Sequence, residues 1–432
     1  MTVLAGAIVE RLSAVLRGRL ARNIGWYGAA EFAARITRLA TAIIVARVTS
    51  RADLGCAAAV LTAFELIRTL TNNGIGQAVI RAADRELAAV CVTAHRAVQI
   101  LCFGMAALQL GVAGALALAG ATQAGSMLAS LSLVYLLMAP GLVQVYRIQR
   151  SNRLHIVAAI ATIQMVADNL LTACLAYAGF GAWALILPKL LVAPIWLLGV
   201  RRHEPWRLTR DVQGAPISRV LRFAAPVLGT ELLNAARLNL DNIMVGSVLG
   251  LEALGVYYFV FNAGIGLSLS LTSAMSGALF PHLAEGAPDC RTLLARFDRA
   301  LPSAVLPVSL VITLQAAASL FYVPVVFGSR WHDAAPLVAM LCASAIAKPF
   351  ADAGCQLLRA RGRTRQEFVT ILIVTTLYLG SFGLALTRGL AFAITTLAVV
   401  ATSLHIAVAV TARFSARPPL STNHVLAEGI AP

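Results

Sequence analysis

Apolar segments of about 20 residues recur from one end of the chain to the other. Each is long enough to cross the hydrocarbon core of a bilayer as an α-helix, which rises 1.5 Å per residue. With turn residues and charges taken as boundaries, the segments predict about 12 helices. The expected ranges are 23–48, 53–76, 93–119, 125–147, 154–178, 182–200, 219–249, 254–284, 300–327, 333–359, 365–387 and 390–413.

Composition agrees with a membrane protein. The 432 residues are 59% hydrophobic and 12% charged, with a mean hydropathy of +0.80. Soluble domains carry about a quarter of charged residues, so a soluble domain is excluded. The first 22 residues interleave arginines with apolar residues rather than placing charge ahead of an apolar core, so they predict an amphipathic helix and no cleaved signal peptide.

The loops between the predicted helices alternate in charge. Of the 35 lysines and arginines, 25 lie in loops on one side, four lie on the other and six fall within helices. Cytoplasmic loops carry the excess of Lys and Arg in membrane proteins, so we expect both termini in the cytoplasm. Topology then accounts for most of the net charge of +16. A nucleic acid partner, which such a charge suggests in a soluble protein, is not expected.

The chain repeats itself with a shift of 200 residues: residues 28–55 align without a gap on residues 228–255. The aligned pairs include Glu31 with Glu231, Val45 with Val245, Val48 with Val248, and Leu54 with Leu254. An even number of helices in each half keeps both halves in one orientation, so two six-helix lobes related by a parallel repeat are predicted. The expected divisions are an amphipathic cytoplasmic segment at 1–22, lobes at 23–200 and 219–413, a basic cytoplasmic linker at 201–218 and a cytoplasmic tail at 414–432.

Ionisable residues inside the predicted helices are the candidates for function. At about 3 kcal/mol each on insertion scales, a dozen dry charges would cost tens of kcal/mol. The polar residues of each helix keep to one stripe, as do Glu31, Arg35 and Arg38, spaced i, i+4 and i+7. Two interpretations stay open. The charges form internal salt bridges, with Glu65 beside Arg68 and Lys348 beside Asp352 as self-compensating pairs, or they line a hydrated central cavity with a cationic lining. The number of charges favours the cavity.

Arginine suits bidentate recognition of phosphate or carboxylate groups. The candidate cations for binding an anionic substrate are Arg35, Arg38, Arg237, Arg68 and Lys348. Membrane carboxylates serve as proton relays, and the candidate acids for coupling or gating are Asp241, Glu31, Glu231, Asp168 and Asp352.

The residues predict neither a metal site nor a catalytic centre. The seven cysteines contain no C-x-x-C pair, so no zinc site and no disulfide framework are expected. No cofactor is expected beyond a coupled H⁺ or Na⁺. The outer connections are too short to house an extracytoplasmic active site, which argues against an enzyme such as a polymerase or a glycosyltransferase.

Several motifs follow one another in a fixed order. They are Ala52-Asp53-Leu54-Gly55, Gly179-Phe180-Gly181-Ala182-Trp183, Asn239-Leu240-Asp241-Asn242 with Leu254-Gly255 and Tyr257, Leu279-Phe280-Pro281, and Ala360-Arg361-Gly362-Arg363. With these motifs the chain resembles bacterial polysaccharide transporters and O-antigen flippases (Wzx-like) of the multidrug/oligosaccharidyl-lipid/polysaccharide (MOP) exporter superfamily. The resemblance runs from about residue 23 to residue 413.

The resemblance implies two lobes around a cationic lumen, which alternate between inward-open and outward-open forms in the bacterial inner membrane. The implied cargo is a polyprenyl-diphosphate-linked oligosaccharide, the repeat unit of an O-antigen, capsule or exopolysaccharide. Membrane lipids surround such a carrier, and a polysaccharide polymerase and glycosyltransferases are its candidate partners. The alternative is a MATE-like multidrug or metabolite antiporter. Six intramembrane cations and 7% aromatic residues favour an anionic cargo over the organic cations of that alternative.

Overall fold

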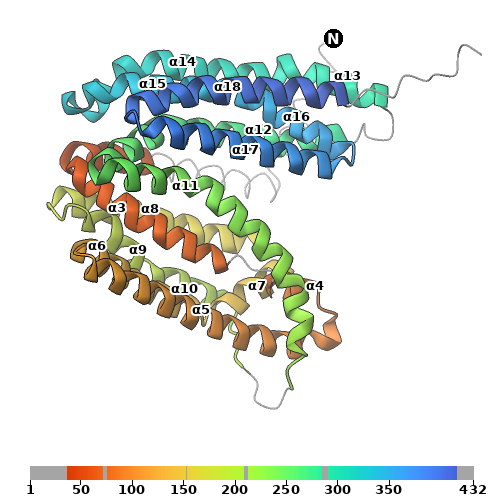
Figure 1. Ribbon diagram of the computed structural model, residues 1–432. Coiled ribbons are helices and arrows are strands. Elements are labelled where there is room, and N and C mark those ends of the chain that lie inside the picture. Colours follow the sequence, from red (N-terminus) through yellow and green to blue (C-terminus); the bar gives the residue numbers. More distant parts are fainter. Residues whose placement is uncertain (1–36, 72–74, 152, 209–212, 285–289, 416–432) are drawn as a thin grey trace, which may run out of the picture. The chain divides into compact units, whose positions relative to one another are not determined.

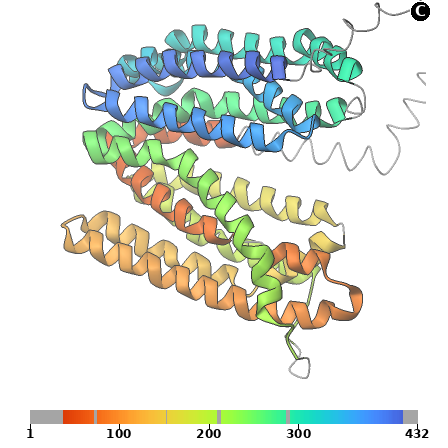
Figure 2. The same cartoon turned by 45° about the vertical axis from the view of Figure 1, so that its right-hand side comes forward.

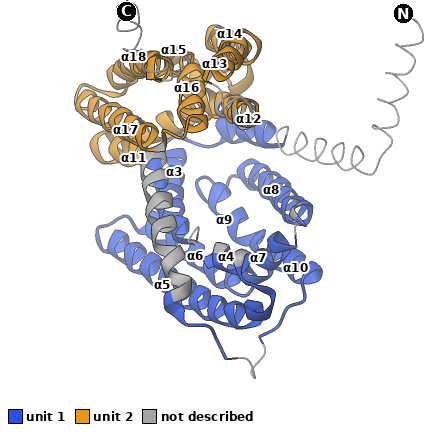
Figure 3. Ribbon diagram, turned by 90° about the vertical axis from the view of Figure 1, so that its right-hand side faces the viewer, with its two compact units in different colours: residues 1–239 blue, residues 240–432 orange. Residues whose placement is uncertain are grey.

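The computed structural model describes residues 37–71, 75–151, 153–208, 213–284 and 290–415, and all regular elements in these ranges are helices (Figure 1). Nine of the described helices are long and apolar enough to cross a membrane, and the number rises to ten if the bent pair α6–α7 is counted as one span. The protein is therefore an all-α, multi-pass membrane protein. By its internal contacts the chain divides into two compact units, residues 1–239 and 240–432 (Figure 3). This division falls within helix α11, and the domain boundary predicted at 201–218 stays a prediction.

Unit 1 is described from a helix over 37–48 onward. The further helices of unit 1 are α3 (Arg51–Arg68), η1 (Thr69–Thr71), α4 (Ile75–Arg81), η2 (Asp84–Glu86), α5 (Leu87–Leu118), α6 (Thr122–Met138), α7 (Leu142–Arg150), α8 (Leu154–Tyr177), α9 (Trp183–Leu191) and α10 (Ala193–His203). The longest of them, α5, packs along α6, to which a three-residue connection joins it (Figures 1 and 2).

Two of the predicted spans in unit 1 are broken by proline. The span expected at 125–147 is α6 followed by α7, with a bend of 50° at the segment that contains Pro140. The span expected at 182–200 is α9 followed by α10, and Pro194 stands in the first turn of α10. Proline lacks the backbone N–H that the helix needs and clashes with the preceding turn, which accounts for the bend between α6 and α7 and for the interruption between α9 and α10.

Unit 2 contains the greater part of α11, in which Gly250 is not helical and has φ 83° and ψ 178°. This conformation is nearly restricted to glycine, and it turns the chain between the predicted helices at 219–249 and 254–284. The helices are α11 (Ile217–Ala263), α12 (Ile265–Ala284), α13 (Cys290–Ala300), η3 (Leu301–Val305), α14 (Leu306–Tyr322), η4 (Val323–Phe327), η5 (Ser329–Ala334), α15 (Ala335–Ser344), α16 (Lys348–Ala360), α17 (Thr364–Leu386) and α18 (Leu390–Ser415).

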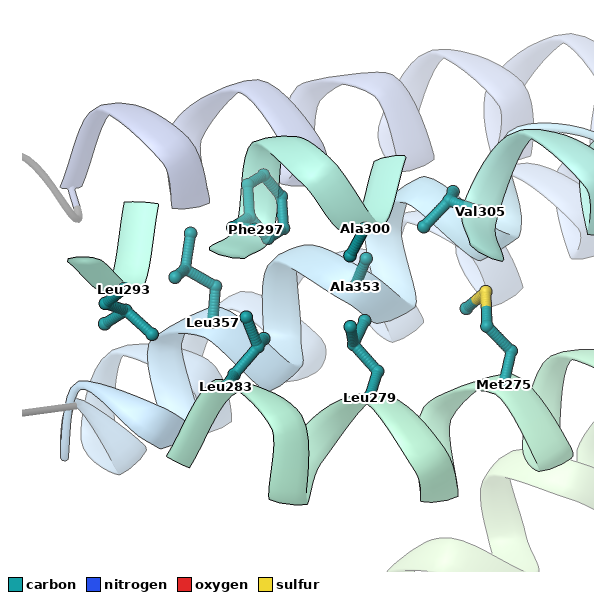
Figure 4. Close-up of a cluster of buried hydrophobic side chains, with 9 residues drawn as sticks. All are labelled: Met275, Leu279, Leu283, Leu293, Phe297, Ala300, Val305, Ala353 and Leu357. Atoms are coloured by element: carbon teal, nitrogen blue, oxygen red, sulfur yellow. The ribbon is translucent and has the colours of Figure 1, made fainter. Parts of the chain in front are cut away.

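A cluster of buried apolar side chains joins α12, α13 and α16 in unit 2 (Figure 4). On α12 the side chains of Met275, Leu279 and Leu283 recur every fourth residue, so they lie on one face of the helix. This face meets Phe297 of α13 and Leu357 of α16. This packing holds the three helices together, and α16 also carries the polar residues Lys348 and Asp352.

The predicted repeat is visible in the burial of its paired residues. Val45 and Val245 are both buried, and so are Leu54 and Leu254, whereas Val48 and Val248 are 46% and 51% exposed. Equivalent positions of the two copies thus meet equivalent surroundings. The two copies differ in the turn between their two helices. In the first copy Ser50 caps α3 by accepting a hydrogen bond from Asp53 N at 3.0 Å. The second copy has Gly250, with its positive φ, at the equivalent position.

Candidate functional site

Polar side chains of α8 hold the helix over 37–48 in unit 1. Thr41 Oγ1 donates a hydrogen bond to the backbone oxygen of Asn169 at 2.8 Å, and Asn169 Nδ2 donates to Thr37 Oγ1 at 3.3 Å. Beside them, Arg38 Nη2 lies 3.0 Å from the Sδ atom of Met165. A thioether is a weak acceptor, and the side chain of Arg38 is exposed. The guanidinium of Arg38 therefore keeps donors with which it can bind an anion.

At Asp168, next to Asn169, α8 forms an ion pair with α9. Lys189 Nζ lies 2.8 Å from Asp168 Oδ2, and the two side chains are 33% and 17% exposed. The other carboxylate oxygen, Oδ1, is buried and has no hydrogen-bond partner among the described residues. A buried acceptor without a donor is costly, so Asp168 has the capacity to bind a further cation, proton or water.

Two other ion pairs lie within single helices. On α3, Arg68 binds Glu65 Oε2 through Nε at 2.9 Å and Nη2 at 2.6 Å. On α16, Lys348 Nζ lies 2.8 Å from both carboxylate oxygens of Asp352. The i, i+3 and i, i+4 spacings place these partners on one helix face. Both pairs match the salt-bridge interpretation of the intramembrane charges, and all four side chains remain partly exposed.

In unit 2, the buried carboxyl group of Asp241 has only neutral donors among the described residues. Asp241 is 6% exposed, and its Oδ2 accepts a hydrogen bond from the hydroxyl of Tyr257 at 2.7 Å. Its Oδ1 accepts from the backbone N–H of Asn242 at 2.9 Å. Within the described ranges no lysine or arginine pairs with it. Intramembrane carboxyl groups commonly exchange a proton or a small cation, and Asp241 has no cationic partner among the described side chains.

The ring of Tyr257 is fixed by its own surroundings. It is 1% exposed and packs against Phe382 of α17, with 5.7 Å between the ring centroids. The hydroxyl of Tyr257 thus has a defined position, and the Asp241 carboxylate is oriented by it.

Four of the predicted site residues cannot be placed. Glu31 and Arg35 lie outside the described residues, as do the side chains of Glu231 and Arg237. For these and for the remaining candidates the functional roles stay predictions. Thr41, Asn169 and Tyr257 were not predicted as partners in these polar contacts. Two of them carry a signal in the sequence, because Tyr257 follows the Leu254-Gly255 motif and Asn169 adjoins Asp168.

The fold is that of a known class of membrane carriers. An inward-facing multidrug resistance MATE family transporter of the MOP superfamily matches with a TM-score of 0.69 at 16% identity, over 89% of this chain and 94% of that one. Lipid II flippase MurJ in its inward closed conformation matches with a TM-score of 0.70 at 11% identity, over 90% and 87%. The chain therefore has the two-lobe, 12-helix fold that these carriers share.

Within this class, the family described as polysaccharide biosynthesis proteins matches residues 44–336, and the chain belongs to that family. The succinoglycan biosynthesis transport protein ExoT of Rhizobium meliloti is 26% identical over 339 residues, 75% of this chain and 65% of ExoT. The lipopolysaccharide biosynthesis protein WzxC of Escherichia coli is 25% identical over 170 residues, 38% of this chain and 34% of WzxC. The chain thus spans less than two thirds of either relative. The resemblance inferred from the motifs is confirmed.

Proposed function

We propose that the protein flips a polyprenyl-diphosphate-linked oligosaccharide from the cytoplasmic to the outer leaflet of a bacterial inner membrane. The observation that carries the proposal is the family match over residues 44–336 on a fold similar to that of a lipid II flippase. The names of two relatives, a succinoglycan transport protein and a lipopolysaccharide biosynthesis protein, agree with such a cargo. Both termini would lie in the cytoplasm, as the loop charges predict.

In this mechanism the protein makes and breaks no covalent bond and is not an enzyme. Arg38 binds the diphosphate, because guanidinium groups match phosphate geometry. Arg35 and Arg237, two other arginines predicted from the sequence, take part in the same binding. The free donors and the exposure of Arg38 support this role. The polyprenyl tail stays in lipid, and the sugars cross as the protein alternates between inward-open and outward-open forms.

Alternation is driven in this proposal by an H⁺ or Na⁺ gradient that acts through Asp241. The absence of a lysine or arginine partner within the described residues supports Asp241 over Asp352, whose carboxylate is neutralised by Lys348 on the same helix. An acid that already has a resident cation gains less from a transported one. Membrane lipids contact the apolar faces. Glycosyltransferases supply the cargo, and a polymerase consumes it.

The test is deletion of the gene for this protein in its native host. Lipid-linked oligosaccharide is expected to accumulate on the cytoplasmic leaflet, measured in spheroplasts as lipid-linked sugar that a membrane-impermeant oxidant such as periodate cannot reach. Surface polysaccharide should fall in parallel, and the plasmid-borne chain should restore both. Normal surface polysaccharide without such accumulation would refute the proposal.

A second candidate function, multidrug antiport, is favoured by the similarity to the MATE family transporter. It predicts that proteoliposomes take up a fluorescent organic cation such as ethidium when an ion gradient is imposed. The intramembrane arginines and lysines favour the anionic cargo instead, because they repel organic cations. Gradient-driven uptake of ethidium together with normal surface polysaccharide in the deletion strain would favour the antiporter.

A further inference from the structure

A basic pocket in unit 1 lies apart from all the groups described above. Its volume is about 430 Å³. It is formed near the start of α5 by His95 and Gln99, at the α6–α7 bend by Gln144, at the end of α10 by Arg201, and in the chain that follows α10 by Trp206 and Arg207. Pockets of about 300 to 1,000 Å³ are those that hold small ligands or head groups.

The segment after α10 is held against the helices by ion pairs. Glu204 accepts a hydrogen bond from Arg147 Nε of α7 at 2.9 Å, and its second oxygen accepts from Arg153 Nη2. Arg153 Nη1 also donates to the backbone oxygen of His203 at 3.2 Å. These contacts fix the segment that forms the pocket wall. The charge of Glu204 is compensated by Arg147 and Arg153.

The pocket therefore carries unbalanced positive charge. No aspartate or glutamate lines it, whereas Arg201 and Arg207 do. Neither arginine forms an ion pair or a side-chain hydrogen bond within the described part of the chain, and both are exposed. Two guanidinium groups with all their donors free, at the rim of one cavity, favour an anion with several oxygen atoms.

A buried amide and two rings complete the wall. Gln144 is 4% exposed; its Nε2 donates to the backbone oxygen of Trp206 at 3.3 Å, and its Oε1 has no partner among the described residues. A buried acceptor without a donor invites a ligand hydroxyl. The ring of Trp206 meets the ring of His95 edge to face at 5.5 Å, which gives the pocket an apolar side beside its charges.

From this arrangement we propose that the pocket binds the phosphate-bearing head group of a membrane lipid. The arginines bind the phosphate oxygens, and the Gln144 amide accepts a hydrogen bond from a hydroxyl of the head group. Arg201 lies in the last turn of a membrane-spanning helix and Arg207 lies four residues beyond its end, where lipid phosphates are expected. Basic pockets between helices at this depth bind anionic head groups. The lipid is either an anionic phospholipid or a polyprenyl diphosphate.

The site is tested by native mass spectrometry of the purified full chain, titrated with phosphatidylglycerol, with undecaprenyl diphosphate and with phosphatidylcholine as the zwitterionic control. The double variant R201A/R207A is compared with R361A/R365A, which removes the half-buried Arg361 that follows α16 and the exposed Arg365 in the first turn of α17. Because both variants lose the same charge, general electrostatic attraction changes equally in the two.

We expect R201A/R207A to weaken binding of at least one anionic lipid about tenfold or more, and R361A/R365A to leave it within about twofold. An effect on phosphatidylglycerol alone assigns the pocket to a phospholipid. An effect on undecaprenyl diphosphate alone assigns it to the head group of the proposed cargo. Equal affinities of wild type and R201A/R207A for both anionic lipids, or an equal loss in R361A/R365A, would overturn the proposal.

A single charge reversal keeps the test independent of folding. Arg207 is exposed and forms no ion pair or side-chain hydrogen bond with the described residues, so Arg207→Glu should leave the thermal unfolding temperature unchanged and should weaken lipid binding more than Arg207→Ala does. Binding is measured without transport, so the failure of the flippase proposal would leave this result standing. If Arg207→Glu binds both anionic lipids as tightly as wild type, the pocket is not a head-group site.

Discussion

The hydroxyl of Tyr257 donates a hydrogen bond to Asp241 Oδ2 at 2.7 Å, and both side chains are buried. The two residues belong to the segments before and after Gly250, so the turn at Gly250 brings them together. In the first copy of the repeat, Thr41 occupies the position of Asp241 and donates its hydrogen bond to the backbone of Asn169. Both copies thus use this position for a polar contact, but only the second places an ionisable group there.

Tyr257→Phe should destabilise the protein by removing this donor. The ring can still pack against Phe382, while Asp241 Oδ2 loses its donor. A buried acceptor left without its donor costs about 1–3 kcal/mol, so the free energy of unfolding in detergent should fall by that amount. Tyr177→Phe, at an exposed position, is the control and should change nothing. A loss of the same size when Tyr257→Phe is made in the D241N background would contradict the interaction.

Asp241→Asn should uncouple transport from the ion gradient. The amide keeps the size of the carboxylate but cannot take up a proton and binds Na⁺ weakly, so flipping in proteoliposomes should no longer accelerate when a gradient is imposed. Asp298→Asn is the matched control, because Asp298 is exposed and pairs with Arg413 at 3.1 Å. A wild-type protein whose flipping persists unchanged after both the H⁺ and the Na⁺ gradients are collapsed would remove the basis of this prediction.

Arg38→Ala should slow flipping about tenfold or more at normal protein levels. One charge-assisted contact to a diphosphate contributes about 1.5–3 kcal/mol, and a factor of ten corresponds to about 1.4 kcal/mol. The readout is the lipid-linked sugar on the cytoplasmic leaflet. Arg413→Ala, which removes an arginine from an exposed ion pair, should leave that quantity unchanged. Wild-type levels of accumulation in the Arg38→Ala strain would show that Arg38 does not bind substrate.

An ion pair between two helices and an ion pair within one helix should differ in the coupling free energy that a double-mutant cycle measures. The Asp168–Lys189 pair joins two helices and is the more buried at its carboxylate, whereas Lys348 and Asp352 are one turn apart on a single helix. We expect a coupling free energy of about 1–2 kcal/mol for the first pair, discounted for its exposure, and about 0.5 kcal/mol for the second. The cycles use Asp→Asn and Lys→Met with unfolding measured in detergent. A larger coupling for the pair on α16 would reverse this ranking.

The sequence predicted the helices well because a span needs a long apolar run, which is visible without any tertiary information. It did not predict the break between α6 and α7, since Pro140 and Gly141 interrupt a run whose length alone suggests one helix. The repeat likewise followed from the sequence, and the shared burial of Val45 and Val245 agrees with it.

The polar contacts were predictable only where their spacing is local. Glu65 with Arg68 and Lys348 with Asp352 stand one helical turn apart, so spacing alone predicts that they meet. The pairing of Lys189 with Asp168 depends on how α9 packs against α8, which no local pattern contains. The pocket beneath Arg201 and Arg207 depends in the same way on where ion pairs hold the segment after α10.

Gly250→Ala should destabilise the second unit, because Gly250 adopts φ 83° and ψ 178°. Side chains rarely adopt this region, and forcing one into it costs about 1–3 kcal/mol. A methyl group would meet no atom within 4 Å, so any loss reports backbone strain rather than a clash.

Gly380→Ala is the matched control: Gly380 lies within α17, and its added methyl group also meets nothing within 4 Å. There alanine should be neutral or should stabilise by up to about 1 kcal/mol. Thermal unfolding in detergent compares the two variants, and equal unfolding temperatures would show that the turn at Gly250 tolerates a side chain. Because this turn also brings Tyr257 to Asp241, Gly250→Ala should weaken gradient coupling as well, whereas Gly380→Ala should preserve it.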